Sequence, residues 1–166
     1  MSPSFPRSAF ADQRAAELAV ELVMPMITAG LESRRIGASG FLYIVILDPG
    51  ARPHECSFEE AILHEHAIGD RDAWDADYAQ YAREKARTCW QHDRNGHELR
   101  TTSPHLLRTS ETGVWGGVQL DGIVVGVSGA DPWFDEAIGL SIAATLRAIA
   151  KERALQLPES LWLNDR

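Results

Sequence analysis

The sequence predicts an α+β domain in which a β-hairpin leads into a buried strand and the strand leads into a long helix. Leu120-Asp121-Gly122-Ile123 places an Asp-Gly pair between two apolar runs, and this pair tolerates the positive φ angles of a two-residue hairpin turn. Residues 123–127 are apolar throughout, which is typical of a strand that is covered on both faces. Amphipathic helical patterns before and after this segment complete the fold class.

The residues that follow this strand carry the signals of a helix start. Ser128-Gly129 ends the strand, Asp131 is a residue type that accepts hydrogen bonds from free first-turn amides, and Pro132 suits the first helical position. Acidic residues at 135 and 136 place negative charge near the positive end of the helix dipole. We expect a helix from Pro132 to about Arg153. Its apolar stripe is wide enough to pack on a sheet, and it contains Ile138, Ile142, Leu146 and Ile149, with Ala137, Leu140, Ala144 and Ala148 beside them.

The first half of the chain predicts a helix and then a strand. Apolar residues recur at helical spacing from Asp12 to Ile27, and Pro25 should kink or end that helix. Residues 41–47, FLYIVIL, form a β-prone run that Asp48-Pro49-Gly50 stops. Residues 55–68 fit two patterns, because positions 57–60 have the form of a helix capping box while the apolar residues that follow also fit the alternation of a strand.

Residues 74–91 predict a helix that carries a lysine on its apolar side. Tyr78, Ala82, Lys85 and Cys89 fall on one stripe at spacings of four, three and four. Lys85 is therefore expected to face the core. After the break at Asn95-Gly96, residues 99–107 allow one short helix before Pro104 and one after it.

The composition limits the partners that the chain is expected to have. Its 166 residues suffice for one domain, which we expect at 11–166, after a flexible tail at 1–10. Sixteen lysines and arginines against 24 acidic residues give a formal charge of −8, and no basic patch could follow a phosphate backbone, so we expect no nucleic-acid partner. No apolar run approaches the length of a membrane span, so we expect a cytoplasmic protein without a membrane partner.

Two further features bear on assembly and redox state. Cys56 and Cys89 lack the paired spacing of a zinc site or a disulfide framework and are interpreted as reduced, structural thiols. The end of the sequence is unexpectedly apolar, with Leu155, Leu157 and Leu161-Trp162-Leu163. Such a segment usually docks on its own core or on another subunit.

The order of these elements, together with several short motifs, resembles the haem-degrading or GlcG-like family. The resemblance covers roughly Phe41 to Ala150 and rests on Gly116-Gly117-Val118, Asp121-Gly122, Val127-Ser128-Gly129 and Asp135-Glu136, with Lys85-Ala86 matching a lysine-alanine pair on the preceding helix. It implies an antiparallel sheet of four to five strands with flanking helices, similar to profilin-like folds. It also makes residues 55–68 a second strand. Members of the family are commonly homo-oligomers.

The same resemblance implies small-molecule binding, because the family includes haem-binding proteins, a component encoded alongside glycolate oxidation, and a domain appended to cobalamin-related enzymes. Lys85 is the strongest candidate ligand-binding residue. A lysine on an apolar stripe suits a cation that holds an anionic ligand or an amine with lowered pKa, although it could also extend its ammonium into water. Arg94 and His97 lie beside the Asn-Gly turn, from which side chains can reach a cleft.

The remaining candidates come from the glycine-rich region and from a histidine pair. Gly116, Gly117 and Ser128 belong to the family motifs, and the turn after Ser128 could offer backbone amides to a ligand. His64 and His66 would share one face of a strand, but no third ligand lies at a spacing typical of a metal site, so we expect the polar face of a strand and no metal.

We therefore expect a homo-oligomeric, GlcG-like protein that binds a small molecule, either haem or another anionic metabolite, with no assignable catalytic step. The alternative is a structural or regulatory protein whose oligomer surface is its function. A haem-degrading enzyme ranks third, because no histidine or tyrosine stands where the family pattern would make it an axial ligand.

Overall fold

The computed structural model describes residues 5–157 and contains one antiparallel sheet. Its strands are β1 (Leu42–Leu47), β2 (Ile62–Ile68), β3 (Gly117–Leu120) and β4 (Ile123–Ser128), in the spatial order β2-β1-β4-β3. β1 and β4 lie in the interior of the sheet, and every residue of both strands is buried. The α+β class and the four-stranded antiparallel sheet with flanking helices are therefore confirmed.

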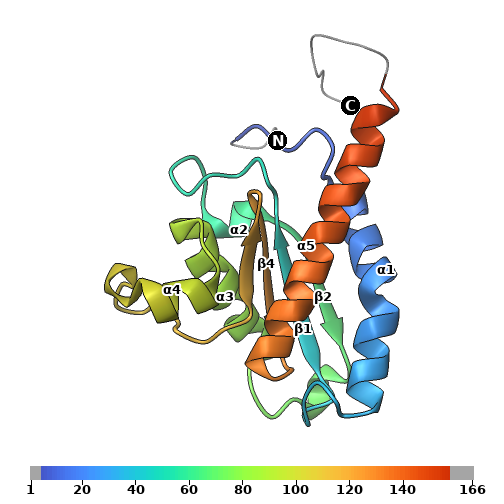
Figure 1. Ribbon diagram of the computed structural model, residues 1–166, viewed down its shortest axis with the longest axis vertical. Helices are drawn as coiled ribbons and strands as arrows, with labels where there is room; N and C mark the ends of the chain where they lie inside the picture. The colour runs from blue at the N-terminus through green and yellow to red at the C-terminus, as the bar shows by residue number, and fades with distance from the viewer. Residues whose placement is uncertain (1–4, 158–166) are drawn as a thin grey trace.

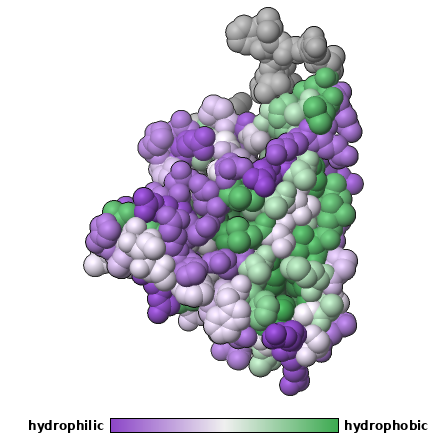
Figure 2. Space-filling view, viewed as in Figure 1, coloured by the Kyte–Doolittle hydropathy of each residue, from purple (hydrophilic) through white to green (hydrophobic). Residues whose placement is uncertain are grey.

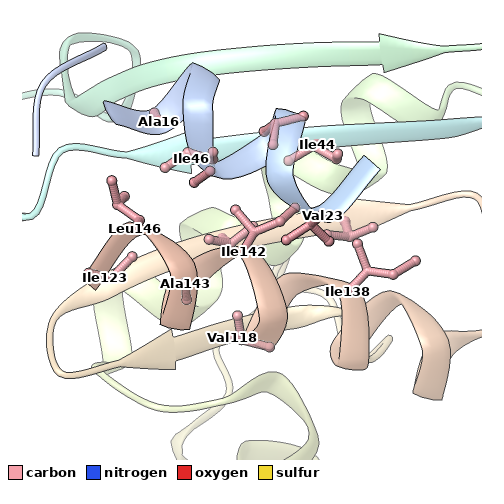
Figure 3. Packing of buried hydrophobic residues seen from close by; sticks show 14 of the residues in the cluster. Ala16, Val23, Ile44, Ile46, Val118, Ile123, Ile138, Ile142, Ala143 and Leu146 are labelled. Atoms are coloured by element: carbon pink, nitrogen blue, oxygen red, sulfur yellow. The ribbon is translucent and has the colours of Figure 1, made fainter. Parts of the chain in front are cut away.

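Helices cover both faces of this sheet (Figure 1). α1 (Gln13–Glu32) and α5 (Pro132–Leu155) lie side by side on one face, and α3 (Tyr78–His92) lies on the other. Alternation along the strands divides the core in two, because successive side chains of a strand point to opposite faces. Ile44 and Ile46 pack towards α1 and α5, whereas Tyr43 and Val45 pack towards α3. The aliphatic cluster under α1 and α5 is shown in Figure 3.

The hairpin and the strand after it follow the sequence prediction closely. Asp121 and Gly122 have φ angles of 50° and 83°, and Leu120 pairs with Ile123 across the turn. The short α4 (Gly96–Thr102) and a 3₁₀ turn at Pro104–Leu106 stand where two short helices were expected. α5 begins at Pro132 as expected, but the Asp131 side chain makes no capping hydrogen bond. Just before the helix, the Ala130 amide donates to Asp135 Oδ1 at 2.9 Å.

The assignment of residues 55–68 to a strand is wrong for its first part. Residues 58–61 form the single-turn helix α2 (Phe58–Ala61), and only Ile62–Ile68 form β2. The capping box is complete, because Ser57 Oγ accepts from the Glu60 amide while the Glu60 carboxylate accepts from the Ser57 amide. These reciprocal hydrogen bonds satisfy two backbone amides. In a strand, the same amides would need acceptors on a neighbouring strand.

Of the two outcomes expected at Pro25, a kink or an end of the helix, the end is wrong, because α1 continues past the proline to Glu32. Val23 and Ile27, on either side of the proline, are buried in the core, and this packing holds the helix together. Pro25 and Glu21 are exposed, so the carbonyl that loses its helical partner can be hydrated.

The helix expected at 74–91 starts later, at Tyr78, because a 3₁₀ turn at Arg71–Ala73 and the Asp77 cap come first. Within the expected N-terminal tail, Phe5 is 3% exposed and the Ser8 amide donates to Asp48 Oδ1 at 3.0 Å. Leu161-Trp162-Leu163 lie outside the described residues. None of the helices described within residues 5–157 has both the length and the apolar character needed to cross a membrane.

Candidate functional site

Lys85 lies in a buried polar centre between α3, β4 and α5. Its side chain is 3% exposed, and its ammonium donates to Asp135 Oδ2 and to the Val127 carbonyl, both at 2.9 Å. The predicted stripe places it here, since Tyr78, Ala82 and Cys89 are buried with it. The charge of Lys85 is therefore neutralised inside the protein. Its role as a ligand-binding cation stays a prediction.

Asp135 is the partner that turns this lysine into a structural link. Burial raises the pKa of Asp135 to about 6, against the lowering effect of the nearby Lys85 ammonium. Its second oxygen accepts from the Ala130 amide. Because each ion is buried, removal of one partner would leave an uncompensated charge, which typically costs about 3–5 kcal/mol.

Gly116 and Gly117 bring the start of β3 against this centre. Gly116 has a φ of +110°, and a Cβ there would lie 2.8 Å from Lys85 Nζ. A Cβ at Gly117 would lie 2.5 Å from the Lys85 carbonyl oxygen and 2.6 Å from Cys89 Sγ. Such distances leave no room for a side chain, so packing accounts for both glycines. The thiol of Cys89 is inert here, because burial raises its pKa to about 12.

Ser128 and the loop residues lie in different surroundings. Ser128 is buried at the end of β4, opposite Tyr43 and next to the carbonyl that accepts from Lys85. Arg94 is occupied within its own loop, where Nη1 donates to Ser103 Oγ at 2.9 Å. The structure thus brings Lys85, Gly116, Gly117 and Ser128 together but leaves Arg94 apart from them.

His97 belongs to a second cluster, formed with two residues that the sequence analysis did not combine with it. Its ring stacks on Trp115, with centroids 3.9 Å apart and an interplanar angle of 24°. His97 Nδ1 lies 3.6 Å from Glu136 Oε2. Trp115 Nε1 and Glu136 Oε2 are buried and have no hydrogen-bond partner among the described residues. Glu136 follows Asp135 in the chain, so the two clusters are adjacent.

His64 and His66 lie on one face of β2, as the alternation predicts, opposite Ile46 and Ile44 in register. Their ring centroids are 6.0 Å apart, and burial lowers the pKa of His64. Within residues 5–157, no group of three or more His, Cys, Asp or Glu side chains is arranged to hold a metal ion. The expectation that the pair binds no metal stays a prediction.

A cavity of about 710 Å³ lies outside the site residues that the sequence analysis singled out. It lies between the loop after β1, the end of α3 and the β3–β4 hairpin, which are far apart in the sequence. No local motif marks it. The lining residues are Ala51, Arg52, Pro53, His54, Trp90, Gln91, Asp93, Gln119, Asp121, Gly122 and Val124. None of the predicted site residues is among them.

Several polar groups of the cavity wall are held by hydrogen bonds or ion pairs, either to one another or to residues behind the wall. Trp90 Nε1 donates to the Ala51 carbonyl at 3.2 Å, and this bond connects α3 to the loop after β1. Gln119 Nε2 donates to Asp93 Oδ1 at 2.6 Å, and Asp121 pairs with Arg147. Arg52 Nη1 donates to the Pro49 carbonyl. Arg52 is the one permanently charged cation among the described residues that line the cavity.

The chain matches no protein-family model, and no curated protein sequence is significantly similar to it. The resemblance to the GlcG-like family therefore stays a prediction that rests on the motifs alone.

Proposed function

We propose that this protein binds a small molecule that carries an anionic group, and that the binding site is the cavity between the loop after β1, the end of α3 and the hairpin. The cavity volume, about 710 Å³, is the observation that carries the proposal. It falls in the range of small-molecule sites, about 300–1,000 Å³. Trp90 and Val124 offer an apolar floor, and Arg52 at the loop offers a guanidinium to an anion.

The two candidate cations differ in their availability, and this difference favours Arg52. The Lys85 ammonium already contacts a carboxylate and a carbonyl in the core. Arg52 is exposed and donates to one backbone carbonyl, which leaves most of its five N–H groups for a ligand. A cytoplasmic location and membership of the GlcG-like family remain parts of this proposal.

Haem fits this cavity poorly. The one imidazole among the described lining residues is His54, whose side chain is 79% exposed, so an axial ligand would be held loosely in water. A smaller ligand with one anionic group and a ring or short apolar part fits better. No step of chemistry is assigned.

A titration with phenyl phosphate, which combines a ring with an anion, tests the proposal by amide-resolved NMR. We expect saturable shifts of the Gly122 amide and of the Trp90 indole N–H, because both residues line the cavity. Arg52→Gln should weaken binding at least 5-fold, about 1 kcal/mol. The matched control is Arg34→Gln, which changes an exposed arginine that follows α1.

Absence of saturable shifts, or equal weakening by both variants, would overturn this site assignment. Shifts confined to Lys85, Gly116 and Ser128 would instead return the ligand to the buried centre. Haemin, followed at its Soret band, should produce no saturable change that depends on His54.

A further inference from the structure

The cavity between the loop after β1, the end of α3 and the hairpin lies on the hydrophilic side of the molecule. In Figure 2, hydrophilic residues predominate where Figure 1 places α3 and the loop after β1, whereas hydrophobic residues gather along α5 and α1. The cavity wall combines one arginine and two aspartates with two glutamines. We therefore expect its ligand to be recognised mainly through charges and hydrogen bonds.

Two charges of opposite sign in the cavity wall have no ion-pair partner within residues 5–157. Arg52 Nη1 donates to a backbone carbonyl, and Asp93 Oδ1 accepts from the neutral side-chain amide of Gln119 at 2.6 Å. The third charged residue of the wall differs, because Asp121 pairs with Arg147. One positive and one negative charge of the same cavity are thus left for a ligand.

Asp93 is held in a fixed position although its side chain is exposed. It caps the end of α3 in the left-handed conformation, with a φ of 53°, and its amide donates to the Cys89 carbonyl. Gln119 of β3 holds one carboxylate oxygen, and the other, Oδ2, accepts no hydrogen bond from residues 5–157. The C-terminal end of a helix also carries partial negative charge, which favours a cation at this place.

The indole of Trp90 lies beside both charged residues. Its Nε1 donates to the carbonyl of Ala51, which immediately precedes Arg52. Trp90 also precedes Asp93 by three positions, about one helical turn along α3. Arg52 and Asp93 form no salt bridge with each other, so a ligand can reach both from the Trp90 ring.

We propose that the ligand of this cavity is a zwitterion whose anionic group binds Arg52, whose ring or apolar part lies on Trp90, and whose ammonium group donates to Asp93. This inference rests on the proposed function, because it adds a second point of recognition to the same site. An ammonium supplies charge-assisted hydrogen bonds to a carboxylate, which are stronger than those between neutral groups. It also lowers the net negative charge of the ligand, which eases the approach to a chain of formal charge −8.

Two probes that differ in one positive charge test this inference by amide-resolved NMR titration of the full chain. Phosphotyramine carries a phosphate and an ammonium at opposite ends of a ring, and N-acetylphosphotyramine replaces the ammonium by a neutral amide. The wild type should bind phosphotyramine about 5-fold more tightly, which is the size of a well-placed exposed ion pair. The ratio compares two ligands on one protein, so effects of a substitution on folding or on the phosphate contact largely cancel.

Asp93→Asn should abolish the preference, because asparagine tolerates the left-handed backbone and keeps an oxygen for Gln119 but has no charge. Asp121→Asn is the matched control. It makes the same change of charge in the same cavity, and an Asn-Gly pair preserves the hairpin turn. Since Asp121 already pairs with Arg147, this variant should keep the preference.

The outcomes separate this inference from the proposed function. Equal binding of both probes, with phenyl phosphate still bound in a way that depends on Arg52, would overturn the zwitterion inference alone. Absence of saturable shifts with all three compounds would overturn the proposed function as well. A preference that survives Asp93→Asn, or that is also lost in Asp121→Asn, would overturn the contact between the ammonium and Asp93.

Discussion

The two faces of the sheet are packed by different physical means. Under α1 and α5 the core is aliphatic, with Ile44, Ile142 and Leu146 fully buried. Under α3 the helix approaches the sheet so closely that glycines are needed, and the buried Lys85–Asp135 pair joins α3 to α5. An aliphatic layer can adjust to small changes by moving side chains, whereas a layer of backbone contacts and a buried ion pair cannot.

The sharpest test of this contrast is a pair of glycine-to-alanine substitutions. A Cβ at Gly126 would lie 2.1 Å from the Ala82 carbonyl oxygen, so Gly126→Ala must push α3 away from the sheet. We expect a loss of at least about 4 kcal/mol in the free energy of unfolding, measured with urea. At Gly139 of α5 the nearest atom is a side-chain methyl of Val118, at 3.1 Å. Gly139→Ala should change stability by no more than about 1 kcal/mol, because the gain in helix propensity offsets the tighter contact. Equal effects would remove the contrast.

A slightly smaller loss in the free energy of unfolding is expected when the Lys85–Asp135 ion pair is broken. Lys85→Met keeps the length of the side chain but leaves Asp135 buried without a partner, and we expect a cost of about 3–5 kcal/mol. Replacement of both residues, by Lys85→Met with Asp135→Leu, should recover a large part of that loss. The coupling energy from the double-mutant cycle measures this recovery. Additive effects would mean that the two side chains act separately.

The smallest expected effect is the part of the pH dependence of the free energy of unfolding that Asp135 contributes. Its pKa of about 6 in the folded protein lies above the ordinary value of 3.8, so the folded state keeps the proton to higher pH. The stabilisation that comes from this more tightly held proton is complete below about pH 4 and is lost as the pH rises through 6. Relative to Asp135→Asn, the wild type should therefore lose up to about 3 kcal/mol between pH 4 and pH 6.5. Parallel stability curves for the two proteins would contradict the raised pKa.

Local patterns predicted most of the elements because each has a local physical cause. The Asp-Gly turn, the apolar strand after it and the Pro132 helix start depend on residues a few positions apart. Lys85 was correctly placed towards the core by helical spacing. Its partner was not predictable, since Asp135 lies 50 residues away and its pairing depends on how α5 returns across the sheet.

The cavity escaped prediction, and local sequence left open whether Pro25 would kink the first helix or end it. Three distant segments build the cavity wall, and no spacing within any one of them indicates that they meet. Tertiary packing on both sides of Pro25 outweighs the local preference for a break. The short α2 is the opposite case. Its capping box is a local sequence signal for a helix, and the assignment of residues 55–68 to one continuous strand did not use that signal.

The pairing of β1 with β4 has a consequence for the order of assembly during synthesis. Tyr43 pairs with Ser128 and Ile46 with Val125, so the central ladder joins residues about 80 positions apart. The β1–β2 pair can form while the chain is still on the ribosome, but the β1 edge that receives β4 stays open until residue 128 has emerged. Until then a nascent chain presents an unpaired, fully apolar strand edge. Slow translation before this point would lengthen that exposure, and chaperone binding to the nascent chain would shield it.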